Sequence, residues 1–483
     1  MSLAPVYELL ERNAQDRPGD AFFLHGEAAV TYGDASLTVK RTAAVLRGHG
    51  LLPGDRILLQ LGNSPEFIYL YLAALQLGVI PILVNPAARR YELRYYCATA
   101  RPRLVVTSGS LFSQYTIDGQ AFIAPDRLLA SDDPSGTGLW AGAAASPPLQ
   151  AFEPPAPDTP AALIFTSATD GFARGALLTH GGIHTAVCAA HSMLVDSRDR
   201  FLAMLPFFHS FGLTSSLILP LYSCVPIVLL DRFSPRALLD IFSREPVTIT
   251  CGVPAMYQIL ARVLPGDVRF PRMKAWISGG EALSASLQAS ILQDHGIEIR
   301  QGYGLTEASP IVTWNDMASP NRPGSAGRPM PYNEVRILEK GNSRPGSPEG
   351  EILVRGANVI HEYFEDKAAT RAAIQDGWLR TGDLGYLDTN NYLYVTGRIK
   401  EMVIRRGLNV YPREVERILY NHPEIENVRV SGQTIPLEDH SFKESLGCSV
   451  HPRQGSWLNA NSLAEWCREN ISAYKIPETF EFI

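Results

Sequence analysis

The sequence predicts an α/β protein whose larger part consists of parallel sheets flanked by helices, followed by a smaller unit of helices and strands. Segments with helical and with strand periodicity alternate over most of residues 1–320, which is typical of strand–helix–strand units. Residues 140–160 are rich in Ala and Pro without periodicity and predict a surface connection. From 322 to 396, short apolar stretches between Gly, Pro and Asn predict a β-rich unit. A proline-led helix over 412–420, strands and a last helix over 461–469 follow.

The first predicted elements follow the hydrophobic periodicity of the chain. Residues 38–47 and 65–78 are predicted helices, and residues 55–61 and 80–85 are predicted strands. The apolar stretch 69–84 is interrupted by Gln, Gly and Pro, and it is shorter than the roughly 20 residues that a membrane-spanning helix needs. It therefore predicts a buried helix that turns at the glycine into a buried strand, and no transmembrane segment.

Composition and charge exclude several classes of function. The 483-residue chain is 46% hydrophobic and 19% charged, which is ordinary for a globular protein with sizeable cores. Its net charge of −6 gives no global attraction to nucleic acid or anionic membranes, so neither is an expected partner. The six cysteines include no CxxC pair, which predicts neither a zinc site nor a disulfide framework. Glu8, Glu11 and Arg12 argue against a secretory signal, and we expect a cytoplasmic protein.

A polar turn with an arginine follows a short apolar strand in the segment 163–180, which reads LIFTSATDGFARGALLTH. The turn contains Thr166, Ser167, Thr169 and Arg174. Small and hydroxyl residues let backbone N–H groups turn toward an anion, and arginine adds fixed positive charge. The GxxxxGK[ST] pattern of a Walker A loop is absent. On the residues alone, a phosphate-binding loop and an ordinary polar turn are equal alternatives.

Five further motifs follow this loop along the chain. They are AMLPFFHSFGL at 203–213, KAWISGGEAL at 274–283, QGYGLTE at 301–307, WLRTGDLGY at 378–386 and GRIKEMVIRRGLNVYPREVE at 397–416. With the loop and in this order, they resemble the motifs of the adenylate-forming superfamily, which contains acyl-CoA synthetases, firefly-type luciferases and peptide-synthetase adenylation domains. Each motif is weak alone, whereas the whole series across nearly the entire chain is specific. The form RGLNVYP looks more like fatty acyl-CoA ligases than like acetyl-CoA synthetases.

The resemblance implies a domain organisation. Residues 1–396 would form a large N-terminal domain of two αβ-layered lobes plus a β-rich subdomain over about 322–396. Residues 397–483 would form a small mobile α+β C-terminal domain that rotates about a hinge at Lys400, with the active site at the junction. Relatives carry an adenylation lysine just after a segment similar to 473–483, so we expect the chain to stop short of that lysine.

The chemistry that the resemblance implies has two steps. A carboxylate attacks the α-phosphorus of ATP to give an acyl-AMP, and the acyl group then passes to a thiol. Because the reacting partners of the first step are anions, the site must supply positive charge, backbone donors and Mg²⁺. The expected partners are therefore a small-molecule carboxylic acid, ATP, Mg²⁺, and CoA or the phosphopantetheine of an acyl carrier protein.

The resemblance also assigns roles in nucleotide binding. Thr306 would bind the α-phosphate as a catalytic residue, Glu307 would be catalytic and hold Mg²⁺, and Asp383 would accept hydrogen bonds from the ribose. The remaining nucleotide-binding residues are implied to be Thr166, Ser167, Thr169, Arg174, Gly279, Gly280, Glu281, Tyr303 and Arg398. The structural alternatives are a solvated loop carboxylate for Glu307, a turn-forming Asp383 and a core role for Tyr303.

The acid pocket is implied by PFFHSFG. His209 would be a catalytic residue that lines the pocket and gates the thiol channel, and an aromatic-packed structural histidine is the alternative. Phe208 and Phe211 would line the same pocket. The segment has no acidic residue to pair with a substrate ammonium, so a fatty or aryl acid is expected rather than an amino acid. Gly407 would leave room for pantetheine in the thiol tunnel.

The phosphate loop departs from the superfamily pattern. Ala168, Asp170 and Arg174 stand where relatives usually have glycine, threonine and lysine. Arginine keeps the positive charge, but Asp170 beside a polyphosphate would repel it by about 4 kcal/mol for unit charges ~4 Å apart at a dielectric of ~20. Two alternatives to an acid–thiol ligase therefore stay open. One is an acyl-AMP ligase with an amine or hydroxyl acceptor, and the other is a nucleotide- or acyl-binding pseudoenzyme.

Overall fold

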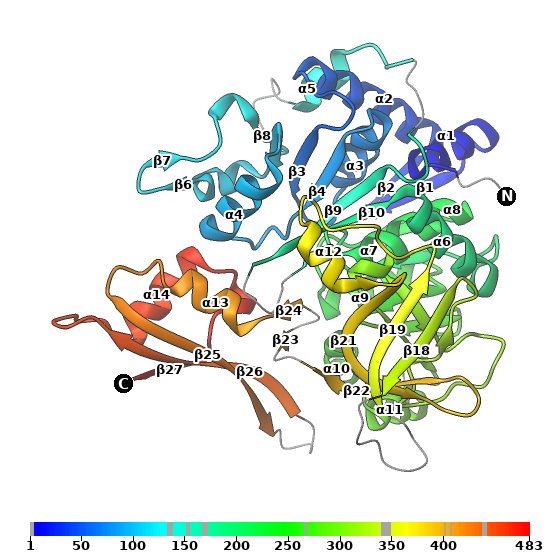
Figure 1. The fold of residues 1–483 in the computed structure, drawn as a ribbon. Coiled ribbons are helices and arrows are strands. Elements are labelled where there is room, and N and C mark those ends of the chain that lie inside the picture. Colours follow the sequence, from blue (N-terminus) through cyan, green and yellow to red (C-terminus); the bar gives the residue numbers. More distant parts are fainter. Residues whose placement is uncertain are drawn as a thin grey trace.

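The computed structural model describes residues 4–132, 139–150, 155–166, 172–264, 268–339, 349–399, 402–405, 408–436 and 442–483. Two large sheets with helices on both faces, a smaller antiparallel sheet and a C-terminal unit form the molecule (Figure 1). The predicted fold class, α/β with a β-rich part and an α+β C-terminal part, is confirmed. Below, residues 4–399 are called the N-terminal unit and residues 402–483 the C-terminal unit.

The first large sheet has six strands in the order β10-β9-β4-β3-β5-β8. Its neighbours are parallel except for the antiparallel pair β9–β10. Ile57 and Leu59 face the central core, whereas Leu58 faces the opposite side of the sheet, as the period of a strand requires. The strands are β3 (Arg56–Gln60), β4 (Ile80–Leu83), β5 (Leu104–Thr107), β8 (Leu128–Ala130), β9 (Pro160–Thr166) and β10 (Arg174–Thr179).

The second large sheet has nine strands in the order β17-β16-β15-β14-β13-β11-β12-β1-β2. The six strands from β15 to β1 along this order are parallel, and antiparallel strands extend both ends. The strands are β1 (Ala21–His25), β2 (Ala28–Thr31), β11 (Phe201–Ala203), β12 (Ile227–Leu229), β13 (Ile249–Gly252), β14 (Ala275–Ser278), β15 (Ile299–Gly304), β16 (Ile311–Trp314) and β17 (Arg328–Pro329).

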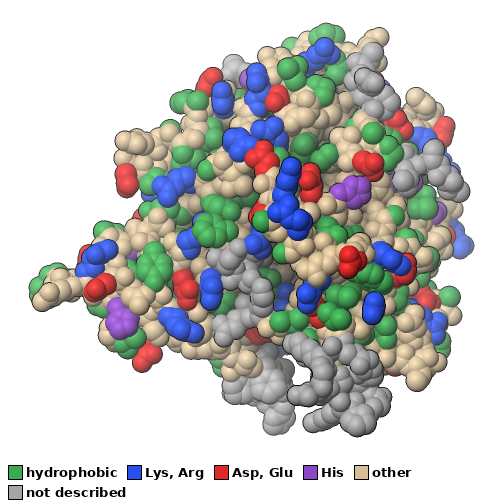
Figure 2. Space-filling view, in the orientation of Figure 1, with side chains coloured by type: hydrophobic (Ala, Val, Ile, Leu, Met, Phe, Trp, Pro, Cys, Tyr) green, Lys and Arg blue, Asp and Glu red, His purple; other side chains and the backbone are tan. Residues whose placement is uncertain are grey.

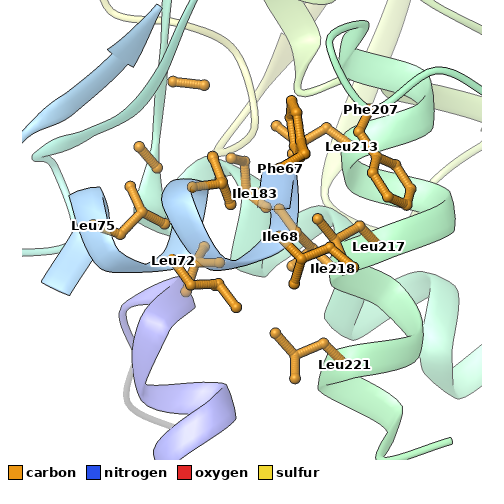
Figure 3. Close-up of a cluster of buried hydrophobic side chains, with 14 of the residues drawn as sticks. Phe67, Ile68, Leu72, Leu75, Ile183, Phe207, Leu213, Leu217, Ile218 and Leu221 are labelled. Carbon is orange, nitrogen blue, oxygen red and sulfur yellow. The ribbon is translucent and has the colours of Figure 1, made fainter. Parts of the chain in front are cut away.

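One hydrophobic core joins the two large sheets through the helices between them. Apolar side chains of helix α3 pack against those of α6, of the π-helical turn η3 and of α8 (Figure 3). Phe67 and Phe207 belong to this cluster, with their ring centroids 5.6 Å apart. The helices of this layer are α1 (Val6–Asp16), α2 (Tyr32–Gly48), α3 (Pro65–Gln76), α6 (His180–Leu194), η3 (Leu213–Ile218) and α8 (Leu219–Ser223).

Other helices cover the outer faces of the two sheets, each over a core of its own. Helix α4 (Arg90–Ala100) covers the first sheet. The second sheet is covered by α9 (Pro235–Arg244), α10 (Pro254–Val263) and α11 (Ala285–His295). The N-terminal unit therefore stacks helices and sheets in alternating layers, as predicted for its two αβ lobes.

The β-rich part is a five-stranded antiparallel sheet that lies beside the second large sheet (Figure 1). Its elements are β18 (Asn333–Glu339), β19 (Gly350–Gly356), α12 (Lys367–Ala373), β20 (Ile374–Gln375), β21 (Trp378–Leu387) and β22 (Leu393–Arg398). The C-terminal unit has its own apolar core. Its elements are β23 (Val403–Arg405), β24 (Leu408–Val410), α13 (Pro412–Leu419), β25 (Ile425–Pro436), β26 (Phe442–Pro452), α14 (Ala460–Asn470), the 3₁₀ turn η5 (Ala473–Lys475) and β27 (Thr479–Phe482).

Two expectations about local structure need correction. Helix α2 begins at Tyr32, earlier than predicted, because the Thr31 hydroxyl caps it by accepting a hydrogen bond from the Asp34 N–H at 3.1 Å. The segment predicted as a surface connection begins with helix α5 (Leu139–Ala145), which packs on α2. Its alanines favour a helix, and its small residues allow close approach to α2. The absence of periodicity was therefore a wrong indicator there.

The surface agrees with the modest net charge. Acidic and basic side chains are interspersed over the face shown in Figure 2, and the C-terminal unit protrudes at its left. Within the described ranges, no helix is both long and apolar enough to cross a membrane.

Candidate active site

A cavity of about 720 Å³ lies where the second large sheet, the β-rich sheet and the C-terminal unit meet. It lies at the carboxyl ends of the parallel strands β13, β14 and β15, the usual place for ligands in open α/β sheets. Its wall combines residues that are far apart in the sequence. These residues include Thr166, Arg174, Ala190, Leu194, His209, Ser210, Phe211, Leu219, Cys251, Ile277, Gly279, Gly280, Tyr303, Gly304, Thr306, Glu307, Trp314, Met330, Tyr363, Asp383, Arg398, Asn409 and Tyr411.

Glycines form one wall of the cavity, directly after strand β14 and at the end of β15. A Cβ atom on Gly279 would lie 3.1 Å from the Phe211 ring, so a side chain there would narrow the space. Gly280 has φ +85, a left-handed conformation that favours glycine. At Gly304 an added Cβ would lie 1.7 Å from the backbone oxygen of Pro310, a distance so short that no residue other than glycine fits there. A side chain at Gly279 would therefore narrow the cavity beside Phe211, and Gly280 and Gly304 allow backbone paths beside it that other residues would not.

Glu307 lies in the cavity wall, and one of its carboxylate oxygens accepts hydrogen bonds from two hydroxyl groups. The Thr166 hydroxyl donates to Glu307 Oε1 at 2.9 Å, and the Tyr363 hydroxyl donates to the same oxygen at 3.0 Å. Hydroxyl and carboxylate oxygens are the hard ligands that Mg²⁺ prefers. No cluster of three or more His, Cys, Asp or Glu side chains suited to a metal occurs among the described residues. A single carboxylate nevertheless fits Mg²⁺, which usually keeps waters and substrate phosphate oxygens as its other ligands.

Asp383 is a buried residue of the cavity wall, on strand β21. Its Oδ2 accepts a hydrogen bond from the Tyr303 hydroxyl at 2.6 Å, and its Oδ1 forms an ion pair with Arg398 Nε at 2.9 Å. Burial raises the pKa of Asp383 above its ordinary value, while Arg398 and the Tyr303 hydroxyl oppose that shift. The arrangement fixes a carboxylate in the cavity with part of its acceptor capacity already used.

Thr306 and His209 come together where η4 (Thr306–Ala308) meets α7 (Ser210–Gly212). The hydroxyls of Thr306 and Ser210 are 3.1 Å apart and share a hydrogen bond. The Phe211 N–H donates to His209 Nδ1 at 3.2 Å, and burial lowers the pKa of His209 to about 4. The imidazole is therefore neutral near pH 7, with its proton on Nε2, and it can donate one hydrogen bond.

Several expected site residues lie away from this wall or outside the described residues. Phe208 packs against the central core and does not line the cavity, and neither does Glu281. Of the three departures in the phosphate loop, Arg174 lines the cavity, whereas Ala168 and Asp170 lie outside the described residues. Ser167, Thr169, Lys400 and Gly407 also lie outside them.

The sequence interpretation missed contributors to the cavity. Tyr363 was not expected there, although its hydroxyl contacts Glu307. Asn409 and Tyr411, by contrast, belong to the RGLNVYP motif, and they bring the C-terminal unit to the cavity. Asp366 forms an ion pair with Arg174, with Arg174 Nε 3.4 Å from Asp366 Oδ2. No local pattern marks Tyr363 or Asp366, since only the fold brings them beside Glu307 and Arg174.

Comparison with protein families gives two matches along the chain. Residues 10–364 match the family described as "AMP-binding enzyme", and residues 414–483 match "AMP-binding enzyme C-terminal domain". Among curated relatives, feruloyl-CoA synthase of an Amycolatopsis species is 32% identical and covers 98% of this chain and 93% of its own length. Long-chain-fatty-acid–CoA ligase of Bacillus subtilis is 28% identical and covers 94% of this chain and 86% of its own length.

Solved structures of o-succinylbenzoate CoA synthetase from Bacillus subtilis are also similar. A double mutant bound to a CoA product analogue gives a TM-score of 0.86 at 26% identity, over 99% of this chain and 95% of that one. The same enzyme with its acyl-adenylate intermediate gives 0.73 at 27% identity, over 99% and 94%. These matches extend over both units of the chain. The cavity residues come from motifs that follow one another in the order of the superfamily. Together with the family matches over residues 10–364 and 414–483, this shows that the chain belongs to the AMP-binding enzyme family of adenylate-forming, acyl-CoA synthetase-like ligases.

Proposed function

We propose that this protein is an AMP-forming acid–thiol ligase that activates a fatty or aryl carboxylic acid and transfers the acyl group to CoA. The observation that carries the proposal is the composition of the single cavity just described. Its wall contains both hydroxyl, carboxylate and guanidinium groups, called the polar part here, and apolar side chains, called the apolar part. An ATP-dependent acid ligase needs both surfaces in contact. The curated relatives reported above are named as CoA ligases of a fatty and an aryl acid.

The polar part suits a nucleotide. Arg174 and Thr166 lie on the strands that flank the phosphate loop, so we assign them to the polyphosphate. Thr306 is assigned to the α-phosphate, and Glu307 would hold Mg²⁺, which offsets the negative charge that develops as pyrophosphate leaves. Asp383 is assigned to the ribose hydroxyls, with Arg398 fixing its orientation. The adenine would lie in the space left by the glycines, beside the Tyr303 ring.

The apolar part suits the acid. Its wall includes Ala190, Leu194, Leu219, Ile277, Phe211, Trp314 and Met330. Burial raises the pKa of the neighbouring Cys251 thiol to about 12, so that side chain is neutral and adds no charge. In this surrounding an alkyl or aryl group gains from burial, whereas a substrate ammonium would lose its hydration without a partner.

The reaction proceeds by two displacements. A carboxylate oxygen attacks the α-phosphorus, the bond to the bridging oxygen breaks, and pyrophosphate leaves. The thiol sulfur, after loss of its proton, then attacks the carbonyl carbon of the acyl-AMP, and AMP leaves with its phosphate oxygen. Neutral His209, through Nε2–H, can donate a hydrogen bond to oxygen at the reacting centre without adding net charge.

We assign the observed arrangement of the two units to the thiol-transfer step. The support is the higher TM-score with the CoA-analogue complex, 0.86, than with the acyl-adenylate complex of the same enzyme, 0.73. In this arrangement Asn409 and Tyr411 of the C-terminal unit reach the cavity. We also propose a domain boundary near residues 396–397, and by resemblance we assign the hinge to Lys400 and the thiol tunnel to Gly407, which both lie outside the described residues. A cytoplasmic location fits the six free cysteines.

The test is a pair of half-reaction assays. ATP–pyrophosphate exchange is measured across a panel of fatty, aryl and amino acids, and CoA or a carrier protein is then supplied to the active combination. We expect exchange with a fatty or aryl acid, followed by thioester formation with CoA. Exchange confined to an amino acid would refute the acid assignment. Binding of ATP without exchange for any acid would favour the pseudoenzyme.

A further inference from the structure

A fully buried lysine joins the two units at a distance from the cavity. Lys475 is 1% exposed, and its Nζ lies 2.7 Å from Glu92 Oε1 and 2.7 Å from Glu414 Oε1. Glu92 belongs to helix α4 of the N-terminal unit, whereas Glu414 and Lys475 belong to the C-terminal unit. Burial alone lowers the pKa of Lys475, but Glu414 and Glu92 more than offset this and hold that pKa well above its ordinary value. The lysine is therefore charged.

Glu92 is the only carboxylate of this group from the N-terminal unit, and the C-terminal unit supplies most of its partners. Its Oε2 accepts hydrogen bonds from Ser472 N at 3.0 Å and Ser472 Oγ at 2.5 Å, while Lys475 contacts Oε1. On its own helix, Glu92 Oε2 also accepts the Arg89 N–H at 3.1 Å. A carboxylate accepts about four such bonds, so each partner is needed to offset the loss of water. Glu92, Glu414, Ser472 and Lys475 are called the Glu92 cluster below.

Helix α4 also contacts the C-terminal unit through two tyrosines on the same side of the helix as Glu92. The ring of Tyr91 lies 5.8 Å from that of Trp466 on α14, and the Arg417 guanidinium of α13 lies 4.5 Å from the Tyr95 ring. Tyr91, Glu92 and Tyr95 fall within an arc of about 100° on the helix. The C-terminal unit thus lies against one side of α4 through two aromatic contacts and one buried ionic contact.

Buried ion pairs are suited to a contact that has to open. Their attraction roughly cancels the cost of dehydration, so they add little net affinity, but they reject any arrangement in which one partner is left alone. If the C-terminal unit rotated away, Glu92 would lose both Ser472 bonds and Lys475, and it would regain water. The Glu92 cluster therefore exists in one arrangement of the units and specifies it.

We infer that Glu92 is a positioning residue for thiol transfer: by binding Ser472 and Lys475 it holds the C-terminal unit where Asn409 and Tyr411 line the cavity. This inference rests on the proposed function, because it assigns the observed arrangement to the second half-reaction. Glu92 contacts no residue that we assign to ATP or the acid. Its loss should leave adenylation intact and slow thiol transfer.

The test variant is Glu92→Gln. The amide keeps the size of the side chain, but its NH₂ group must face either Lys475 Nζ or the Ser472 donors. Because these groups are all hydrogen-bond donors, at least one of the bonds that Glu92 accepts is lost. Ser472→Ala is a milder variant that removes a single side-chain hydrogen bond and leaves the Glu92 side chain unchanged. Glu66→Gln is the matched control, since Glu66 also lies in the first turn of a helix of the N-terminal unit. Two rates are measured: ATP–pyrophosphate exchange, and single-turnover transfer from preformed acyl-AMP to CoA.

The expected result is a split between the two rates. In Glu92→Gln, thiol transfer should fall at least about tenfold and exchange should stay within about twofold, with Ser472→Ala in between and Glu66→Gln like the wild type. Hydrogen exchange at the Ser472 amide should also become faster in Glu92→Gln, because its acceptor is weakened. An equal fall in both rates, or no fall in thiol transfer, would overturn the role of Glu92 alone. A wild-type chain inactive in both half-reactions would overturn the proposed function, and this role with it.

Discussion

Replacing Asp383 with asparagine tests the nucleotide assignment most directly. A carboxylate offers about four acceptor positions. The Tyr303 hydroxyl uses one of them on Oδ2, whereas Arg398 pairs with Oδ1 as an ion pair, so at least two positions stay open to the two ribose hydroxyls. Asparagine keeps the shape but replaces one oxygen by a donor, and it removes the charge that pairs with Arg398. At least one charge-assisted hydrogen bond to the ribose is therefore lost.

The size of the effect follows from that count. A hydrogen bond to a charged group contributes about 1.5–3 kcal/mol, so the affinity for ATP should fall roughly 10- to 150-fold. The measurement is the Kd of ATP by calorimetry, together with the KM of ATP in pyrophosphate exchange. The same measurement with 2′-deoxy-ATP isolates the ribose contact. The wild type should discriminate against the deoxynucleotide, and Asp383→Asn should discriminate much less.

A neighbouring aspartate provides the matched control. Asp388 lies in the turn between β21 and β22, accepts the N–H groups of Asn390 and Tyr392, and pairs with Arg322 at 2.6 Å. It does not line the cavity. Asp388→Asn should leave the affinity for ATP unchanged. The reasoning is refuted if Asp383→Asn binds ATP as the wild type does, or if it weakens ATP and 2′-deoxy-ATP by the same factor.

Three further outcomes are expected. Glu307→Gln should lower turnover by at least about tenfold, or ~1.4 kcal/mol in barrier, with exposed Glu362→Gln as control; unchanged exchange at limiting Mg²⁺ would remove Glu307 from the metal site. Gly279→Ala should place a methyl group against the Phe211 ring and narrow the space assigned to adenine, so the KM of ATP should rise, and an unaltered KM of ATP would contradict this assignment. Burial lowers the pKa of His180 to about 4, below its value in the unfolded chain, so the folded state loses stability as the pH falls. Denaturant unfolding should show the free energy of unfolding decrease by about 2 kcal/mol between pH 7 and pH 5. An equal decrease in His180→Asn would show that His180 is not the source.

The sequence predicted the fold class because hydrophobic periodicity is a local signal. Strand β3 and helix α3 appear close to where their patterns place them, since every residue that defines them lies within a short window. Helix α5 was missed because its alanines give little periodicity and its burial depends on contact with α2. Tertiary contact decided that element, and no local pattern reports such a contact.

The candidate site divides along the same line. Residues inside motifs, such as Glu307 and Asp383, could be chosen from the sequence, and both lie at the cavity. Tyr363 could not, because it lies in none of these motifs and reaches the cavity only through the packing of the chain around it. The burial of Lys475 could not be predicted from the sequence either, because its partner Glu92 lies 383 residues earlier in the chain.

The glycine wall has a consequence for laboratory evolution of substrate range. Gly304 admits no side chain, because the backbone oxygen of Pro310 already occupies the volume that a Cβ would need. Ala190, Leu194 and Leu219 reach the same cavity from helices α6 and α8, where a changed side chain alters volume without altering the path of the backbone. A mutant library aimed at new acids should therefore randomise the helix positions and leave the glycine positions fixed. Most of its members would then fold, and the variation would fall where the acyl group lies.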